Sequence, residues 1–290
     1  MKPLQQLIER LQVTHDVGQQ FIGQASASDV HVYGGLILTQ AIDAAKHCCP
    51  DNYSLQSLHG QFLRPGIVKE AINIRVEDLK DGRRFKVYNV YCQQQGKTIF
   101  FATVTFHLPE DSFQHTQPAP PLTLPADDKA HLFIDRTTPL TAEQSRKDAA
   151  LEVRIDSPNQ LDQPLEPEQV TWFKTSHDST EAASLTDWQQ TLLLAYCSDW
   201  NMPTVAIRPH LIKPQQRLKI ASLDHSIWFY QQASLDNWAA CIQQSPAASG
   251  GRGHTRGLFY SENGELLASV NQESFMVTED KPLTTAIIDR

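Results

Sequence analysis

The second half of the chain repeats a motif of its first half, and this duplication limits the possible folds more than any other feature. Residues 84–106 are RFKVYNVYCQQQGKTIFFATVTF, and residues 252–274 are RGHTRGLFYSENGELLASVNQES. Each segment has a run of alternating apolar and polar residues, then a polar turn that ends in Gly, then a second such run. This is the pattern of a β-hairpin. LHGQFL at 58–63 is echoed by DHSIWF at 224–229. We expect two similar β-rich modules, packed face to face with a cleft between them.

Differences between the two copies indicate candidate functional residues. Gln272 lies within a predicted strand at the position where the first copy has Val104. A lone Gln on a strand is more often a hydrogen-bonding residue than a catalytic one. Its position among apolar neighbours nevertheless makes it a candidate.

The first module is predicted to be one buried helix and a sheet of long strands. Residues 3–12 have the spacing of a short amphipathic helix, and residues 34–48 form a mostly apolar helix that is buried on more than one side. Segments rich in β-branched and aromatic residues predict the strands. They lie at about 18–24, 56–63, 70–78, 84–94 and 97–107. An antiparallel sheet wrapped around a central helix is a hot-dog arrangement, and the fold class is α+β.

The same elements return after a break in the pattern. We place the N-terminal module at 1–108 and a Pro-dense linker that crosses the surface at 109–148, because QPAPPLTLP has no hydrophobic period. The C-terminal module is 149–290, with a helix at 185–198. Its strands are expected near 150–156, 169–175, 216–230, 236–244, 254–261 and 265–277.

Composition excludes several classes of protein. The net charge of −8 argues against a general nucleic-acid binder, and no apolar stretch approaches the roughly 20 residues that cross a bilayer. The N-terminus MKPLQQLIERLQ lacks the apolar core of a signal peptide. We therefore expect a cytoplasmic protein that does not insert into membranes. The five cysteines are odd in number without CxxC spacing, and the histidines show neither HxH nor HExxH, so we expect no metal and no other cofactor.

Two further polar residues have both a structural and a functional interpretation. Asp199 follows the second helix, where Asp is common in turns, although the negative end of the helix dipole disfavours a carboxylate there by about 0.3–1 kcal/mol. Strand alternation places Ser222 on one face with Asp224 and Ser226, and places His225 on the other face. The half-polar face suits a cleft wall or a solvated surface equally. Because GxSxG is absent, the sequence argues against a Ser hydrolase with that motif.

Taken together, these segments resemble the acyl-CoA thioesterase II family, the double hot-dog thioesterases. The resemblance extends from about residue 20 to 277 and thins out in the Pro-rich linker. The segments that carry it occur in the family's order. They are YGGLILTQAIDAA, FLRPG, DGRRFKVYNVYCQQQGKTIF, LLLAYCSDWN, IASLDHSIWF, RGHTRGLFYSENGELLAS and NQES.

The resemblance implies hydrolysis of acyl-CoA through an Asp, a hydroxyl and a Gln that together hold a water molecule. Matched segment by segment, these are Asp199, Ser222 and Gln272. Several members have Thr at the hydroxyl position, so Ser222 is a departure that keeps the hydroxyl and loses a methyl. His59 also matches a His of the family and is a candidate cleft residue.

Thioester chemistry is consistent with such a set, because coenzyme A is a good leaving thiol. Hydrolysis then needs a base and a positioned water, with backbone N–H donors for the oxyanion. Gly34 and Gly35, at the start of the first buried helix, are one candidate for these donors. Arginines near hairpins are candidates for binding the coenzyme phosphates. They are Arg83, Arg84, Arg252 and Arg256.

Two rival functions use the same fold. A hydratase or dehydratase of acyl thioesters would need a proton-abstracting group, and the adjacent Asp224 and His225 are the available pair, although alternation points them to opposite faces. A non-catalytic acyl-CoA-binding protein would not need three residues that hold a water. Exposed sheet edges also predict a homo-oligomer.

Overall fold

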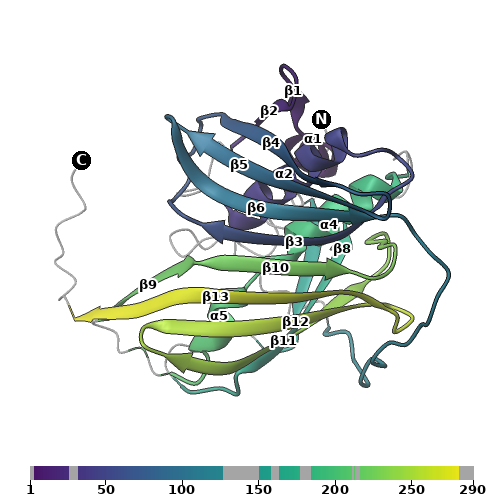
Figure 1. Ribbon diagram of the computed structural model, residues 1–290. Helices are drawn as coiled ribbons and strands as arrows, with labels where there is room; N and C mark the ends of the chain where they lie inside the picture. The colour runs from purple at the N-terminus through teal and green to yellow at the C-terminus, as the bar shows by residue number, and fades with distance from the viewer. Residues whose placement is uncertain are drawn as a thin grey trace.

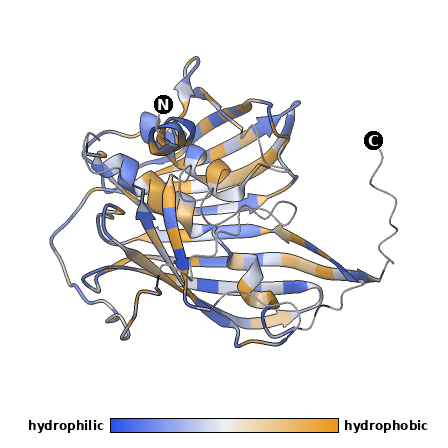
Figure 2. Cartoon of the chain, turned by 180° about the vertical axis from the view of Figure 1, so that it is seen from behind, coloured by the Kyte–Doolittle hydropathy of each residue, from blue (hydrophilic) through white to orange (hydrophobic). Residues whose placement is uncertain are grey.

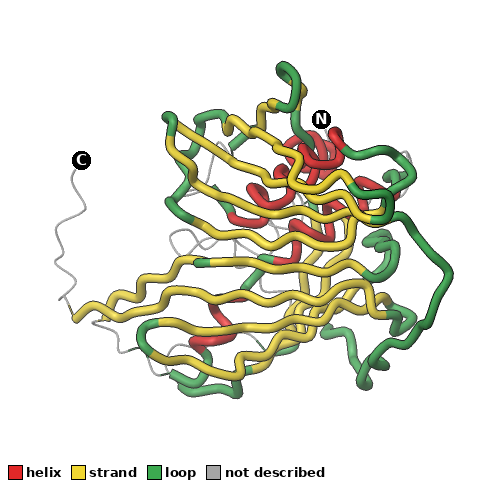
Figure 3. Tube along the Cα trace, in the orientation of Figure 1, coloured by secondary structure: helices red, strands yellow, loops and turns green. Residues whose placement is uncertain are grey.

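A computed structural model describes residues 3–25, 32–126, 150–157, 163–176, 184–210, 212 and 216–280. Within these residues, the strands form one curved antiparallel sheet, and the helices lie on one side of it (Figures 1 and 3). None of the helices in these ranges is long and apolar enough to cross a membrane.

The N-terminal half has the predicted helices and strands. The helices are α1 (Pro3–Leu11) and α2 (Gly34–Cys48). The strands are β1 (Thr14–His15), β2 (Gln20–Gly23), β3 (Ser54–Phe62), β4 (Ile72–Asp81), β5 (Phe85–Gln94) and β6 (Lys97–His107). They pair in the order β1-β2-β4-β5-β6-β3, and α2 packs across β4, β5 and β6. The burial of α2 from Gly35 to Ala45 explains its continuous apolar sequence.

The C-terminal half repeats this arrangement. Its helices are α4 (Asp187–Ser198) and α5 (Met202–Ile207). Its strands are β7 (Leu151–Ile155), β8 (Glu168–Thr175), β9 (Gln216–Ser222), β10 (Asp224–Phe229), β11 (Ala239–Ser249), β12 (Arg252–Ser261) and β13 (Leu266–Asp280). The order β10-β13-β12-β11-β8-β7 repeats the first half outward from the middle of the sheet, with β9 also paired to β13. The duplication and the hot-dog class are therefore confirmed.

The two modules meet edge to edge, so the expectation that they pack face to face was wrong. Strand β3 pairs antiparallel with β10, with Leu58 opposite Ile227 and His59 opposite Ser226 (Figure 1). This pairing satisfies the backbone groups of two strand edges that would otherwise be exposed. Helices α2 and α4 pack against each other on the same side of the sheet, and one apolar core spans both modules.

The core lies between the helices and the sheet. Figure 2 shows apolar segments on the helices and on the strands beside them. Leu38 of α2 and Leu193 of α4 are fully buried, as are Phe100 of β6 and Val104. The helices run in opposite directions, because Trp188 near the start of α4 donates to Asp43 near the end of α2 over 2.7 Å. The start of α2 consequently lies beside the end of α4.

The predicted strand 216–230 is interrupted at Leu223. Ser222 pairs with Ser274 and Ser226 pairs with Asn271, so four steps on one strand match three on its partner. This extra residue is a β-bulge, which reverses the alternation of side chains beyond it. Ser222 therefore faces the helices together with His225, while Asp224 and Ser226 face away from them. The predicted grouping of Ser222 with Asp224 was wrong for this reason.

The first part of the Pro-dense segment crosses the second module. Residues 109–126 contain neither helix nor strand, and Leu122 and Leu124 pack against Trp172 and Trp238 on the sheet. Arg154 of β7 donates to the carbonyl of Pro125 over 3.0 Å. Residues 127–149 lie outside the described ranges, so the boundaries 1–108, 109–148 and 149–290 remain predictions.

Candidate active site

Asp199 is held at the C-terminus of α4 by contacts to the turn that follows it. It is the C-cap residue, and Asn201, two residues further along the chain, has the left-handed φ of 58°. Buried strand side chains bind the following turn: Gln243 donates to the carbonyl of Trp200 over 2.7 Å, and Thr255 donates to that of Met202 over 2.8 Å. The sheet of the second module thus fixes the position of the Asp199 carboxylate.

The N-terminus of α2 supplies the carboxylate with a partner. The N–H of Gly35 donates to Asp199 Oδ2 over 2.9 Å, so the site joins a helix start from one module to a helix end from the other. The positive end of the α2 dipole favours the ionised carboxylate, and the C-terminus of α4 disfavours it. Because Gly35 N–H binds Asp199, it is not the free oxyanion donor that the sequence suggested.

Both glycines at the start of α2 are required by the close approach of Asp199 and α4. A Cβ at Gly34 would lie 2.7 Å from Asp199 Oδ2, and a Cβ at Gly35 would lie 2.5 Å from the carbonyl oxygen of Tyr196. Neither distance is compatible with an ordinary van der Waals contact.

We expect Gly35→Ala to lower stability by about 1–3 kcal/mol and turnover by more than about tenfold, because α2 must move away from α4 and shift the carboxylate. Chemical denaturation and steady-state kinetics measure the two effects. An unchanged unfolding midpoint together with unchanged turnover would show that the helix start tolerates the extra methyl group.

Burial controls the ionisation of Asp199. The residue is 6% exposed, and burial raises the pKa of its carboxyl to about 7, an effect opposed by the Gly35 N–H, Gln272 and Ser222. Tyr33 packs edge-on against Tyr196 and Trp200 beside this carboxylate. Among the described residues, Asp199 Oδ1 has no hydrogen-bond partner. A carboxyl with such a pKa can accept a proton near neutral pH.

The structure brings Ser222 and Gln272 together beside Asp199. Gln272 is fully buried, and its Nε2 donates to Ser222 Oγ over 2.9 Å and to Ser274 Oγ over a longer 3.4 Å. Ser222 and Gln272 both lie close enough to lower the pKa of Asp199, although neither forms a hydrogen bond with Oδ1. Three residues that are far apart in sequence thus form one polar cluster on the helix side of the sheet.

The sequence named His225 only as half of a hydratase pair, and not as the buried partner of this cluster. Its Nδ1 lies 2.6 Å from Gln272 Oε1, and its Nε2 lies 2.9 Å from Ser198 Oγ. Burial lowers the pKa of His225 to about 4, so the imidazole is neutral at physiological pH. The available signal was a lone His at an otherwise apolar alternating position, which is more often structural than functional.

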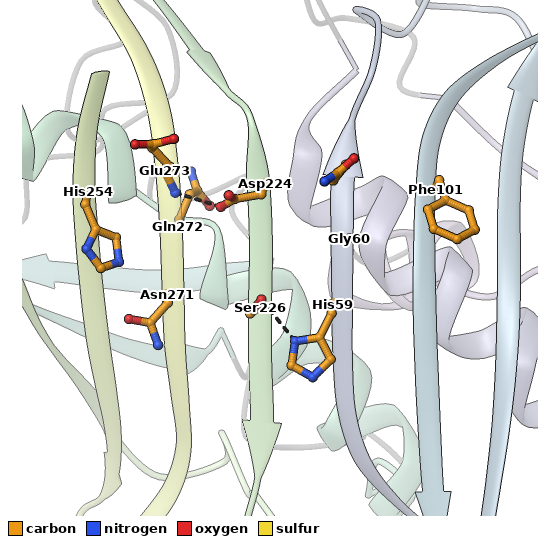
Figure 4. A pocket seen from close by; sticks show the side chains of 10 residues that line it. His59, Gly60, Phe101, Asp224, Ser226, His254, Asn271, Gln272 and Glu273 are labelled. Atoms are coloured by element: carbon orange, nitrogen blue, oxygen red, sulfur yellow. Dashed lines mark hydrogen bonds between the residues drawn. The ribbon is translucent and has the colours of Figure 1, made fainter. Parts of the chain in front are cut away.

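His59, the candidate cleft residue, lies on the opposite face of the sheet. Its Nδ1 is 3.1 Å from Ser226 Oγ, and its ring packs edge-on against Trp228 (Figure 4). It lines a polar concavity of about 540 Å³ at the junction of the modules, and of the three predicted site residues only Gln272 also lines it. His59 is therefore not part of the Asp199 cluster.

The adjacent Asp224 and His225 point to opposite faces, as the sequence predicted. Asp224 lines the concavity on the outer face and accepts a hydrogen bond from the Glu273 backbone N–H over 2.8 Å (Figure 4). In contrast, His225 contacts Ser198 of α4. The two side chains do not form the acid–base pair that a hydratase would need.

The four candidate arginines do not form one basic patch. Arg83 and Arg84 precede β5, whereas Arg252 and Arg256 lie on the exposed side of β12, five strands away and therefore about 24 Å across the sheet. Arg84 forms an ion pair with Glu110 at 2.8 Å. Arg252 forms one with Glu273 at 3.0 Å. These residues give no single coenzyme phosphate site.

Two joined hot-dog modules with a carboxylate, a hydroxyl and an amide at the helix junction define the class of double hot-dog thioester hydrolases. Residues 23–107 match the acyl-CoA thioesterase N-terminal domain, and residues 144–275 match the acyl-CoA thioesterase family. Acyl-CoA thioesterase 2 of Haemophilus influenzae is 32% identical over 253 residues, which cover 84% of this chain and 87% of that protein. The chain belongs to the acyl-CoA thioesterase II family.

Solved structures agree with this assignment. An acyl-CoA thioesterase II from Mycobacterium marinum superposes with a TM-score of 0.75 at 28% identity, covering 94% of this chain and 98% of that one. A hot-dog-fold protein from Alicyclobacillus acidocaldarius gives a TM-score of 0.72 at 20% identity, with coverage of 92% and 96%. The second likeness concerns the fold alone.

Proposed function

We propose that this protein hydrolyses fatty acyl-CoA to a free fatty acid and coenzyme A by direct attack of a water molecule on the thioester carbonyl. The observation that carries the proposal is the convergence of Asp199, Ser222 and Gln272 at the junction of α2, α4 and the sheet. The family membership supports an acyl-CoA substrate. The mechanism requires no metal or organic cofactor.

Each of the three residues has a distinct role in the proposed mechanism. Asp199 accepts a proton from the water through Oδ1, the oxygen that has no partner among the described residues, while Gly35 holds Oδ2. Ser222 and Gln272 orient the same water with their hydroxyl and amide groups. The hydroxide equivalent attacks the carbonyl carbon, the tetrahedral intermediate collapses, and the C–S bond breaks to release the coenzyme A thiolate. The proton held by Asp199 then passes to this thiolate, which regenerates the carboxylate.

The pKa of Asp199 predicts the pH dependence of the reaction. Because the base must be ionised, kcat/KM should rise about tenfold per pH unit below an apparent pKa near 7 and level off above it. Initial rates measured across pH with a thiol-release assay test this profile. A profile that is flat between about pH 5 and 8 would assign the base to a group with an ordinary carboxyl pKa.

The rival functions have weaker support. The candidate site does not offer the acid–base pair of Asp224 and His225 that a hydratase or dehydratase would use, since these two side chains lie on opposite faces of the sheet. A non-catalytic acyl-CoA-binding protein does not account for a buried carboxyl whose pKa is near neutrality. A cytoplasmic location and a homo-oligomeric state remain predictions from the sequence.

Release of free thiol from a panel of acyl-CoAs of increasing chain length tests the function directly. We expect release with at least part of the panel, accompanied by the matching fatty acid. Hydration or dehydration of an enoyl- or hydroxyacyl-CoA without thiol release would support the first rival. Binding of acyl-CoA without turnover of any panel member would support the second.

A further inference from the structure

His225 lies behind the proposed water-binding pair and is not explained by the proposed mechanism. It is fully buried between α4 and β13, and its two ring nitrogens contact Ser198 Oγ and Gln272 Oε1. Ser198 directly precedes Asp199, so the contacts run from the end of α4 through the imidazole to Gln272 and then to Ser222. All three of the buried members, Ser198, His225 and Gln272, are at most 1% exposed.

The hydrogen-bonding capacities along this chain determine its direction. Gln272 Oε1 can only accept, so the neutral imidazole must carry its proton on Nδ1 and donate it to Oε1. His225 Nε2 is then an acceptor, and the Ser198 hydroxyl, which donates to the Ala195 carbonyl over 2.7 Å and lies 2.9 Å from Nε2, shares its single proton between these two acceptors. With its oxygen bound to His225, Gln272 presents its NH₂ group to Ser222 Oγ.

We propose that His225 is a positioning residue that fixes the orientation of the Gln272 amide and thereby keeps the Ser222 hydroxyl proton free for the attacking water. This inference rests on the proposed function. If the amide rotated by half a turn, its oxygen would face Ser222, and Ser222 would donate to Gln272 instead. The hydroxyl proton would then be unavailable to the water.

Two polar substitutions separate the contacts of the two ring nitrogens. In His225→Asn the side-chain amide nitrogen takes approximately the place of Nδ1 and can still donate to Gln272, whereas in His225→Gln it takes approximately the place of Nε2, facing Ser198. We expect His225→Asn to keep kcat within about fivefold of the wild type. We expect His225→Gln and His225→Leu to lower kcat by about 10–100-fold with little change in KM, as for other residues that orient a reactive group. Equal kcat values for the Asn and Gln variants would overturn the inference.

A double-substitution cycle tests whether His225 acts through Gln272. When Gln272→Ala has removed the amide, adding His225→Leu should lower kcat by less than about twofold, because no amide remains to be oriented. A full additional 10–100-fold loss would show that His225 acts by another route. If His225→Leu does not fold, His225→Gln takes its place in the cycle.

A spectroscopic measurement is independent of turnover. In ¹⁵N-histidine-labelled wild-type protein, we expect His225 to give the shifts of a neutral ring protonated on Nδ1, with titration only near pH 4. The Nε2-protonated tautomer would contradict the inference. The proposed function fails separately, if the wild type releases no thiol or if Gln272→Ala alone is fully active.

Discussion

Asp199→Asn is expected to lower kcat by about 10²–10⁴ while the protein remains folded, which is the usual cost of losing a general base. The amide of Asn can still accept the Gly35 N–H through its oxygen, so the junction of α2 and α4 should persist. It cannot accept a proton near neutral pH. Steady-state kinetics with an acyl-CoA that the wild type hydrolyses, together with thermal unfolding, measure both outcomes.

Asp187→Asn is the matched control on the same helix. Asp187 lies exposed in the first turn of α4, remote from the cluster, so its substitution should leave turnover within about twofold, as is usual for changes away from a site. Near-normal turnover of a well-folded Asp199→Asn protein would remove Asp199 from the mechanism. If kcat/KM of that variant still rises with an apparent pKa near 7, a group other than Asp199 causes the rise.

Ser222→Ala and Gln272→Ala are each expected to lower kcat by about 10²-fold, and the double variant should lose far less than the product of the two. In the proposed mechanism both residues hold the same water, and they contact each other over 2.9 Å, so removing either one should already disrupt the position of that water. Kinetics of the two single variants and the double variant give the coupling. Fully additive losses would mean that the two side chains act on different atoms of the reaction.

Ser222→Thr and Ser269→Ala serve as controls for the hydroxyl. The Thr variant keeps the hydroxyl and restricts its rotamers on a strand, so it should stay within a few-fold of the wild type. Ser269 lies on β13, and its hydroxyl contacts the exposed Tyr230, away from the cluster. Its replacement by Ala should leave kcat unchanged.

Much of the fold followed from local pattern and duplication. The helix at 34–48 was predicted with its observed bounds, because a mostly apolar run that follows a Gly pair and has no interior Gly or Pro favours a buried helix. Helix α5 was missed: it has six residues, it begins at Met202 with Pro203 in its first turn, and it contains the β-branched Thr204 and Val205. Such a segment forms a helix through its packing on β11, β12 and β13 rather than through propensity.

The tertiary relations were the part that sequence pattern could not supply. Nothing in LHGQFL and DHSIWF specifies that these two segments, which form β3 and β10, pair with each other where the modules join. They could equally have faced each other across a cleft. The bulge at Leu223 adds a single residue, which no alternation pattern reveals, and it decides which face Ser222 occupies. The separation of the four arginines likewise follows from strand order alone.

The candidate site was located from the resemblance, and the structure adds its connections. Gln272 was the one residue that the duplication itself marked, because its counterpart Val104 is a core residue. Gly35 as the partner of Asp199, and His225 as the partner of Gln272, depend on contacts between elements more than 40 residues apart. Such contacts are not encoded in local spacing.

A single turnover in H₂¹⁸O, with enzyme in excess over an acyl-CoA that the wild type hydrolyses, tests direct attack by water most directly. Rapid quenching followed by mass spectrometry measures both the fatty acid and the intact protein. We expect one ¹⁸O atom in the fatty acid, no acyl adduct on the protein at any time, and no label in the protein. An acyl group trapped on Ser222, or ¹⁸O found in the Asp199 carboxyl, would contradict the account, because either result requires a covalent acyl-enzyme.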